Sequence, residues 1–170
     1  AHDAGMVHRD LKPGNVMLVD PGDGSEFVKF LDFGLVKELH FDDGLTGMDG
    51  VVGSPTYMSP EQIGGQPTDM RSDIYSLGVI MFTALAGRAP FGGINAVATM
   101  CGHLNSPPPP LHADLPGLVE CPSLAHIVAR CLEKDPGHRY PDVDVLLADL
   151  RNALEPLAAI PELEPRPVGE

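Results

Sequence analysis

The sequence has few cysteines and no apolar run long enough to cross a membrane. Its cysteines are Cys101, Cys121 and Cys131, an odd number with no C-x-x-C pair. This pattern is typical of reduced thiols in a cytosolic protein, with Cys131 in a helix core, rather than of a disulfide framework or a zinc site. The longest apolar run, residues 77–86, is half of the roughly 20 residues that a membrane-spanning helix needs. We therefore predict a cytoplasmic location and no membrane segment in this chain, while an anchor beyond Glu170 stays open.

The sequence is also poor in basic residues. It holds 11 lysines and arginines against 24 aspartates and glutamates, a net charge of −13 at pH 7. Such an acidic chain is a poor match for the phosphate backbone of a nucleic acid or for an anionic membrane. If the protein handles phosphate, it needs local cations and Mg²⁺. Its 170 residues, 43% of them hydrophobic, are enough for one globular domain.

The richest chemistry lies near the start of the chain. Residues 8–15 read HRDLKPGN, and residues 32–34 read DFG. These segments supply a base in Asp10, a cation for phosphate in Lys12, and oxygen ligands for a metal ion in Asn15 and Asp32. Transfer of a phosphoryl group from a nucleotide needs these parts and little covalent chemistry.

Here the sequence resembles the protein kinase family. Residues 8–15 fit the catalytic loop H-R-D-L-x-x-x-N, and residues 32–34 are the D-F-G motif. Residues 53–61, GSPTYMSPE, resemble the end of an activation segment, G-T-x-x-Y-M-A-P-E, with Ser54 in place of threonine and Ser59 in place of alanine. Further on, DIYSLG and LEKDPGHRY match two more family patterns in the expected order.

The resemblance implies a role for each residue of the catalytic loop. Asp10 would accept the proton of a substrate hydroxyl, and Lys12 would place its charge on the transferred phosphoryl group. Asn15 and Asp32 would bind the Mg²⁺ of bound ATP. Ser54 would bridge Asp10 and Lys12.

Other matched residues are expected to support the site. His8 would tie the loop to the D-F-G backbone, and Asp73 would hold the backbone of the loop. Arg9 is a cation that could meet a phosphate on the activation segment, and Thr46 is the candidate phosphosite, with an ordinary loop threonine as the alternative. Glu61 should be buried, and a buried carboxylate needs a partner; in the family this partner corresponds to Arg139.

Periodicity and turn signals predict an α+β fold that is mostly α-helical. Residues 16–19 and 27–31 should form a β-hairpin, and residues 73–86 a helix buried on every side that ends at Gly87. Further helices are expected at residues 94–104, at 123–132 with Ser123 as its cap, and at 142–154, which Pro156 should stop. Residues 1–154 would be the C-terminal lobe of a protein kinase, without the N-lobe, and residues 155–170 a Pro/Glu-rich tail or linker.

The prediction is therefore a serine/threonine kinase of bacterial type that transfers the ATP γ-phosphate to protein substrates. The piece alone should be inactive, because no glycine-rich loop with a following V-A-I-K strand is present. Two alternatives remain open: a regulatory module of the pseudokinase type, and a small-molecule phosphotransferase. The intact Asp10, Lys12, Asn15 and Asp32 argue against the first, and the Ser-Pro-Glu segment with its Arg139 partner argues against the second.

Overall fold

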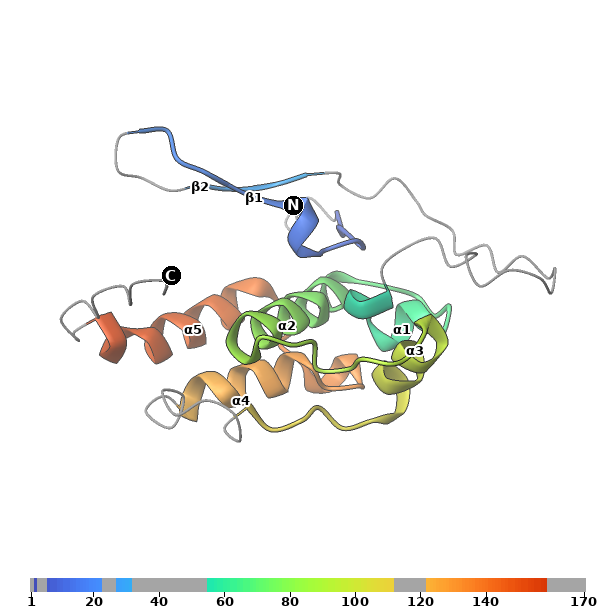
Figure 1. Cartoon of the computed structure of the whole chain (residues 1–170). Helices are drawn as coiled ribbons and strands as arrows, with labels where there is room; N and C mark the ends of the chain where they lie inside the picture. The colour runs from blue at the N-terminus through green and yellow to red at the C-terminus, as the bar shows by residue number, and fades with distance from the viewer. Residues whose placement is uncertain (1, 3–5, 23–26, 32–54, 112–121, 159–170) are drawn as a thin grey trace, which may run out of the picture.

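The computed structural model describes residues 2, 6–22, 27–31, 55–111 and 122–158 of the chain (Figure 1). The sheet consists of β1 (Val16–Val19) and β2 (Phe27–Phe30). The helices are α1 (Pro60–Ile63), α2 (Met70–Ala86), α3 (Ala96–Asn105), α4 (Pro122–Cys131) and α5 (Val143–Ala158). Short 3₁₀ turns lie at η2 (Pro13–Asn15), η3 (Pro55–Tyr57) and η6 (Pro136–His138). In Figure 1 the hairpin lies on one side of α2 and α4 lies on the other.

The predicted hairpin is present, with its second strand one residue shorter than expected. The two strands pair antiparallel, and Val16 is opposite Phe30 while Val19 is opposite Phe27. At the tip, the Asp20 carboxylate accepts a hydrogen bond of 2.7 Å from the backbone N–H of Gly22, which has a left-handed φ of 83°. An Asx turn followed by a glycine of positive φ is the local chemistry that reverses a chain at this point.

Helix α2 is the central helix of the protein, as its apolar pattern predicts, but it is not buried on every side, because Ala84 near its C-terminal end is exposed. Gly78 allows α4 to pack tightly against it, because a Cβ at this glycine would lie 2.6 Å from the Cβ of Cys131. Gly87 ends α2 in the left-handed conformation, with φ of 68°. The predicted start at residue 73 is wrong: α2 begins at Met70, because the Asp69 side chain accepts a hydrogen bond from the N–H of Arg71 and caps the helix.

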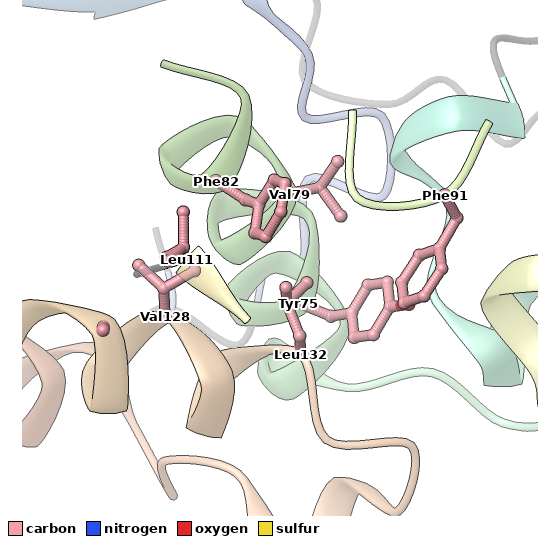
Figure 2. Close-up of a cluster of buried hydrophobic side chains, with 8 residues drawn as sticks. Tyr75, Val79, Phe82, Phe91, Leu111, Val128 and Leu132 are labelled. Carbon is pink, nitrogen blue, oxygen red and sulfur yellow. The ribbon is translucent and has the colours of Figure 1, made fainter. Parts of the chain in front are cut away.

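The larger hydrophobic core gathers around the inner face of α2. Figure 2 shows Tyr75, Val79 and Phe82 of α2 facing side chains from the loops and from α4. The buried members of this cluster are Tyr75, Val79, Phe82, Phe91, Leu111, Ala125, Val128 and Leu132. The cluster fixes α2 against α4 and against the segment that follows α3.

A second cluster joins α4 and α5 and includes the buried thiol of Cys131. Two predicted details are wrong here. Ser123 lies inside α4 rather than at its cap, because the helix already begins at Pro122, a residue suited to the first turn. Helix α5 begins at Val143 and runs through Pro156 to Ala158; a proline so close to a helix end costs one hydrogen bond there and need not stop the last turn.

Among the described residues, no helix has both the length and the apolar character that crossing a bilayer requires. Cys101 is exposed and Cys131 is buried, and both are free thiols. Burial raises the pKa of the Cys131 thiol to about 12, so this sulfur stays protonated and packs as a small apolar group. Cys121 and the tail from residue 159 lie outside the described residues.

Candidate active site

The catalytic-loop segment folds around the carboxylate of Asp10. The ammonium of Lys12 lies 2.8 Å from Asp10 Oδ2, and the amide Nδ2 of Asn15 donates to the same oxygen at 3.1 Å. Nδ2 of Asn15 also donates to the backbone carbonyl of Asp10 at 2.8 Å. The Asp10 and Lys12 side chains are about 30% and 27% exposed, so the pair is anchored from within while one side stays open to solvent.

Asn15 is held at the junction between the loop and the hairpin. It ends the 3₁₀ turn η2, is only 6% exposed, and its backbone carbonyl accepts a hydrogen bond from the N–H of Leu31 at 2.8 Å. His8 Nε2 lies 3.1 Å from the carbonyl oxygen of the same Leu31, and the His8 ring packs edge-on against Phe30. These contacts join the catalytic loop to the chain directly before Asp32.

Asp73, on the first turn of α2, holds the backbone of the loop. Its Oδ2 accepts from the N–H of His8 at 2.7 Å, and its Oδ1 accepts from the N–H of Arg9 at 2.9 Å. The same carboxylate is 2.9 Å from Nε2 of His2. Arg9 has a left-handed backbone with φ of 64°, the only non-glycine residue of this kind in the described chain. Such a conformation persists where the surroundings hold it on several sides.

Glu61 and Arg139 form a buried bidentate ion pair. The guanidinium nitrogens Nη1 and Nη2 lie 2.7 and 2.8 Å from the two carboxylate oxygens, and the Ser72 hydroxyl donates to Glu61 Oε1 at 2.7 Å. The remaining N–H groups of the guanidinium donate to backbone carbonyls of Arg71, Glu133 and Lys134. All the charged atoms therefore have partners, the condition under which a buried pair is tolerated.

The surroundings of Glu61 also set its proton affinity. Burial by itself would raise its pKa, but the hydrogen bonds from Arg139 and Ser72, together with the charge of Arg139, outweigh burial and lower the pKa below its ordinary value. Glu61 is therefore ionised at neutral pH, and the charge complementarity of the pair is complete.

A second polar cluster lies next to η3, with Tyr75 and His103 fully buried and Lys134 partly buried. The Tyr75 hydroxyl is 2.9 Å from Nδ1 of His103, and the Lys134 ammonium lies 3.8 Å from the centre of the Phe91 ring. Burial, with the nearby charge of Lys134, lowers the pKa of His103 to about 4, and burial lowers the pKa of Lys134 to about 8. His103 is therefore neutral at pH 7 and acts as a packed polar side chain of the core.

The structure brings most of the predicted site residues together. His8, Arg9, Asp10, Lys12 and Asn15 share one loop, and Asp73 holds that loop from α2. Asp32, Thr46 and Ser54 lie outside the described residues, so their predicted roles stay predictions. Within the described ranges no group of three or more histidine, cysteine, aspartate or glutamate side chains could hold a metal ion.

Sequence reasoning missed helix α1 and one of its residues, Gln62. The Ser59 hydroxyl accepts from the N–H of Gln62, and the Gln62 side chain accepts from the N–H of Ser59. This is a capping box, and its signal was in the sequence: serine followed three positions later by glutamine, with Pro60 at the first helical position.

The sequence was then compared with known proteins. A model of the protein kinase domain matches residues 1–148, most of the chain. The chain belongs to the protein kinase family. Its mostly helical architecture with a small two-stranded sheet agrees with such a domain, and the motif order that suggested the family is thereby confirmed.

Bacterial serine/threonine kinases are among its curated relatives. The chain is 41% identical over 157 residues to the serine/threonine-protein kinase Pkn1 of Myxococcus xanthus, which covers 91% of the chain and 22% of that protein. It is 41% identical over 142 residues to PknJ of Mycobacterium tuberculosis, with 82% of the chain and 24% of PknJ covered. The chain thus spans about a quarter of the length of these relatives, and the predicted bacterial type is confirmed.

Proposed function

We propose that the protein transfers the γ-phosphate of ATP to serine and threonine hydroxyls of protein substrates. The observation that carries this proposal is the cluster of Asp10, Lys12 and Asn15, in which a carboxylate, an ammonium and an amide meet within 2.8–3.1 Å at a partly exposed surface. The relatives named as serine/threonine-protein kinases support the same reaction. ATP with Mg²⁺ would be one substrate and a protein the other.

We assign Asp10 to the incoming hydroxyl. Among the described residues, both side-chain hydrogen bonds to Asp10 end on Oδ2, and we propose that Oδ1 accepts the proton of a substrate serine or threonine as its oxygen attacks phosphorus. Lys12, fixed beside Asp10, adds positive charge where the transferred phosphoryl group becomes more negative. Neither residue needs to form a covalent bond.

Asn15 and Asp32 are the proposed oxygen ligands for the Mg²⁺ that accompanies ATP. The amide nitrogen of Asn15 is occupied by Asp10, so the amide oxygen remains for the metal, a hard cation that prefers oxygen. Leu31, directly before Asp32, is bonded to Asn15 through its N–H and contacts His8 through its carbonyl oxygen. Asp32 therefore follows a residue that is attached to the catalytic loop at two points.

We further propose that residues 1–154 are the C-terminal lobe of a kinase domain whose N-lobe is not in this sequence, and that residues 155–170 are a tail or linker. The hairpin supports this division, since it leaves large side chains in solvent. These exposed side chains are Met17, Leu18, Phe27, Val28 and Phe30, each between 43% and 69% exposed. Side chains of this size usually pack against another layer. Alone, this lobe would lack most contacts to ATP and would be inactive.

The proposal extends to the segment between the two motifs. Ser54 would bridge Asp10 and Lys12, and a phosphate on Thr46 would pair with Arg9, whose side chain is exposed beside the catalytic loop. We place the kinase domain in the cytoplasm and expect no nucleic acid among its partners, in line with the net charge of −13.

The test is a phosphate-transfer assay on the full-length protein with a generic serine/threonine substrate. Asp10→Asn keeps the shape of the side chain but removes the base, and we expect a fall in kcat of about 10²–10⁴-fold. Asp144→Asn, an exposed change of the same chemistry on α5, is the matched control and should keep wild-type activity. Equal activity in Asp10→Asn and wild type would reject Asp10 as the base.

A further inference from the structure

Gln62 on α1 connects two parts of the site that are far apart in sequence. Its side-chain oxygen Oε1 accepts hydrogen bonds from the backbone N–H of Ser59 at 3.0 Å and from the Ser59 hydroxyl at 3.1 Å. Its side-chain nitrogen Nε2 donates to the backbone carbonyl of Arg9 at 2.7 Å. One amide thus spans from Ser59, the first residue of the Ser-Pro-Glu segment, to the residue before Asp10.

The chemistry at the two ends fixes which residue type can make this link. The N–H of Ser59 can only donate, and the carbonyl of Arg9 can only accept, so the connecting side chain must carry an acceptor and a donor on one planar group. Glutamate has the acceptor without the donor, and lysine has the donor without the acceptor. Glutamine satisfies both ends at once, and the roles of its oxygen and nitrogen follow from the partners.

Arg9 is the place where such a contact has the most effect on geometry. Its left-handed backbone, with φ of 64°, is costly for a side chain with a Cβ. The N–H of Arg9 is held by Asp73 and its carbonyl by Gln62, so the peptide groups on both sides of the strained residue are fixed. Asp10 follows immediately, and its orientation depends on that conformation.

The helix that presents Gln62 is itself rigid. Ser59 is fully buried, and Glu61, next to Gln62, is anchored by the ion pair with Arg139 and by the Ser72 hydroxyl. Gln62 therefore lies on an anchored helix, and its hydrogen bond to Arg9 fixes the position of the catalytic loop relative to that helix.

We propose that Gln62 is a positioning residue that aligns Asp10 with the protein substrate by joining α1 to the backbone of Arg9. This role rests on the proposed kinase function. Residues 59–62 and the loop that carries the base are then held together, so that the backbone of Arg9 keeps the conformation that orients Asp10. Loss of the link should lower kcat while leaving the fold and the binding of ATP unchanged.

The decisive variant is Gln62→Glu in the full-length protein. Glutamate keeps the acceptor for Ser59 and is itself a favoured capping-box residue, so α1 stays capped, but it cannot donate to Arg9. We expect kcat to fall about 3–10-fold, the rate equivalent of one hydrogen bond at a partly exposed site, with the KM for ATP and the melting temperature unchanged. The exposed Gln66→Glu is the control for added charge and should match wild type.

A second readout does not depend on turnover. Hydrogen exchange followed by mass spectrometry should show faster exchange in the peptide that covers residues 6–14 for Gln62→Glu, and wild-type exchange for Gln66→Glu. Wild-type kcat and wild-type exchange in Gln62→Glu would overturn the positioning role. So would a fall in melting temperature equal to that of Gln62→Ala, which loses the capping box as well. If wild-type protein shows no phosphate transfer, the proposed function fails, whereas the exchange result still decides whether Gln62 holds the loop.

Discussion

Two carboxylates, Glu61 and Asp10, are each paired with a basic side chain, and the two pairs differ in almost every respect. The Glu61 and Arg139 side chains are 4% and 0% exposed and lie 78 positions apart in sequence. The Asp10 and Lys12 side chains are about 30% and 27% exposed and lie two positions apart. In the first pair every charged atom has a protein partner. In the second pair, no described residue donates a hydrogen bond to Oδ1 of Asp10.

The difference separates a structural ion pair from a chemical one. The ion pair between Glu61 and Arg139 joins α1 to the turn before α5. Its hydrogen-bonding groups are all used within the protein, so none is available to a substrate. The Asp10 pair contributes little to stability, because solvent screens charges at a surface, but it has an open side, where we propose that a substrate binds. The buried pair, with every charged atom bonded, holds the fold, whereas the partly exposed pair is the one to which we assign the proposed chemistry.

The largest expected effect is on stability, from Glu61→Ala. It leaves the buried Arg139 guanidinium with carbonyl partners but no counter-charge, and we expect the free energy of unfolding to fall by about 3–5 kcal/mol. Urea unfolding followed by circular dichroism measures this, and an unchanged midpoint would show that the pair does not hold the fold. The double variant Glu61→Leu with Arg139→Met should recover part of the loss, because it removes both charges from the core.

A smaller effect is expected from His103, a buried basic group with no acid partner among its described contacts. Its pKa of about 4 lies below the ordinary value near 6.5, so the unfolded chain binds the proton more tightly. The stability that neutral His103 contributes is complete above about pH 6.5 and is lost as the pH falls toward 4, by on the order of 2 kcal/mol. His103→Asn can still accept from Tyr75 but cannot titrate.

Unfolding midpoints measured from pH 7.5 to pH 4 therefore should fall less steeply for His103→Asn than for wild type. The same slope in both proteins would mean that His103 is protonated in the folded state, or exposed. The Glu61–Arg139 pair should contribute little to this pH dependence. The pKa of Glu61 is lowered, so Glu61 stays ionised until the pH falls below the ordinary glutamate value near 4.3.

The smallest effect is expected at the exposed pair of Arg71 and Asp69, which are 35% and 46% exposed. Arg71→Ala removes three guanidinium hydrogen bonds to the carboxylate but keeps the backbone N–H that Asp69 caps. We expect a loss below about 1 kcal/mol that shrinks further in high salt. If Arg71→Ala lowered the free energy of unfolding as much as Glu61→Ala, burial would not explain the difference between the two ion pairs.

Much of the fold could be predicted from the sequence because local signals agree with it. Two short apolar runs around a turn predicted the hairpin, and the many apolar residues of 73–86 predicted a largely buried central helix that Gly87 ends. The errors fall at helix boundaries, where one side chain decides: Asp69 starts α2 early, and Pro156 lies too near the end of α5 to stop it.

The candidate site divides in the same way. The residue types of the catalytic loop are legible in the sequence, since HRDLKPGN brings base, cation and amide within a few positions. Contacts such as Gln62 to Arg9 and His2 to Asp73 could not be predicted from the sequence, because they join residues that are 53 and 71 positions apart. No local pattern encodes which distant backbone carbonyl an amide will reach.

By itself, the sequence determined the family, the residue types of the catalytic loop and most helices, because these depend on residue type and short-range spacing. The resemblance to the family suggested the Glu61–Arg139 pair, but only the tertiary structure decided its bidentate geometry, its further partners and which glutamine contacts the strained backbone before Asp10. Burial and long-range hydrogen bonds arise when separate segments pack together, and that packing is a property of the whole fold.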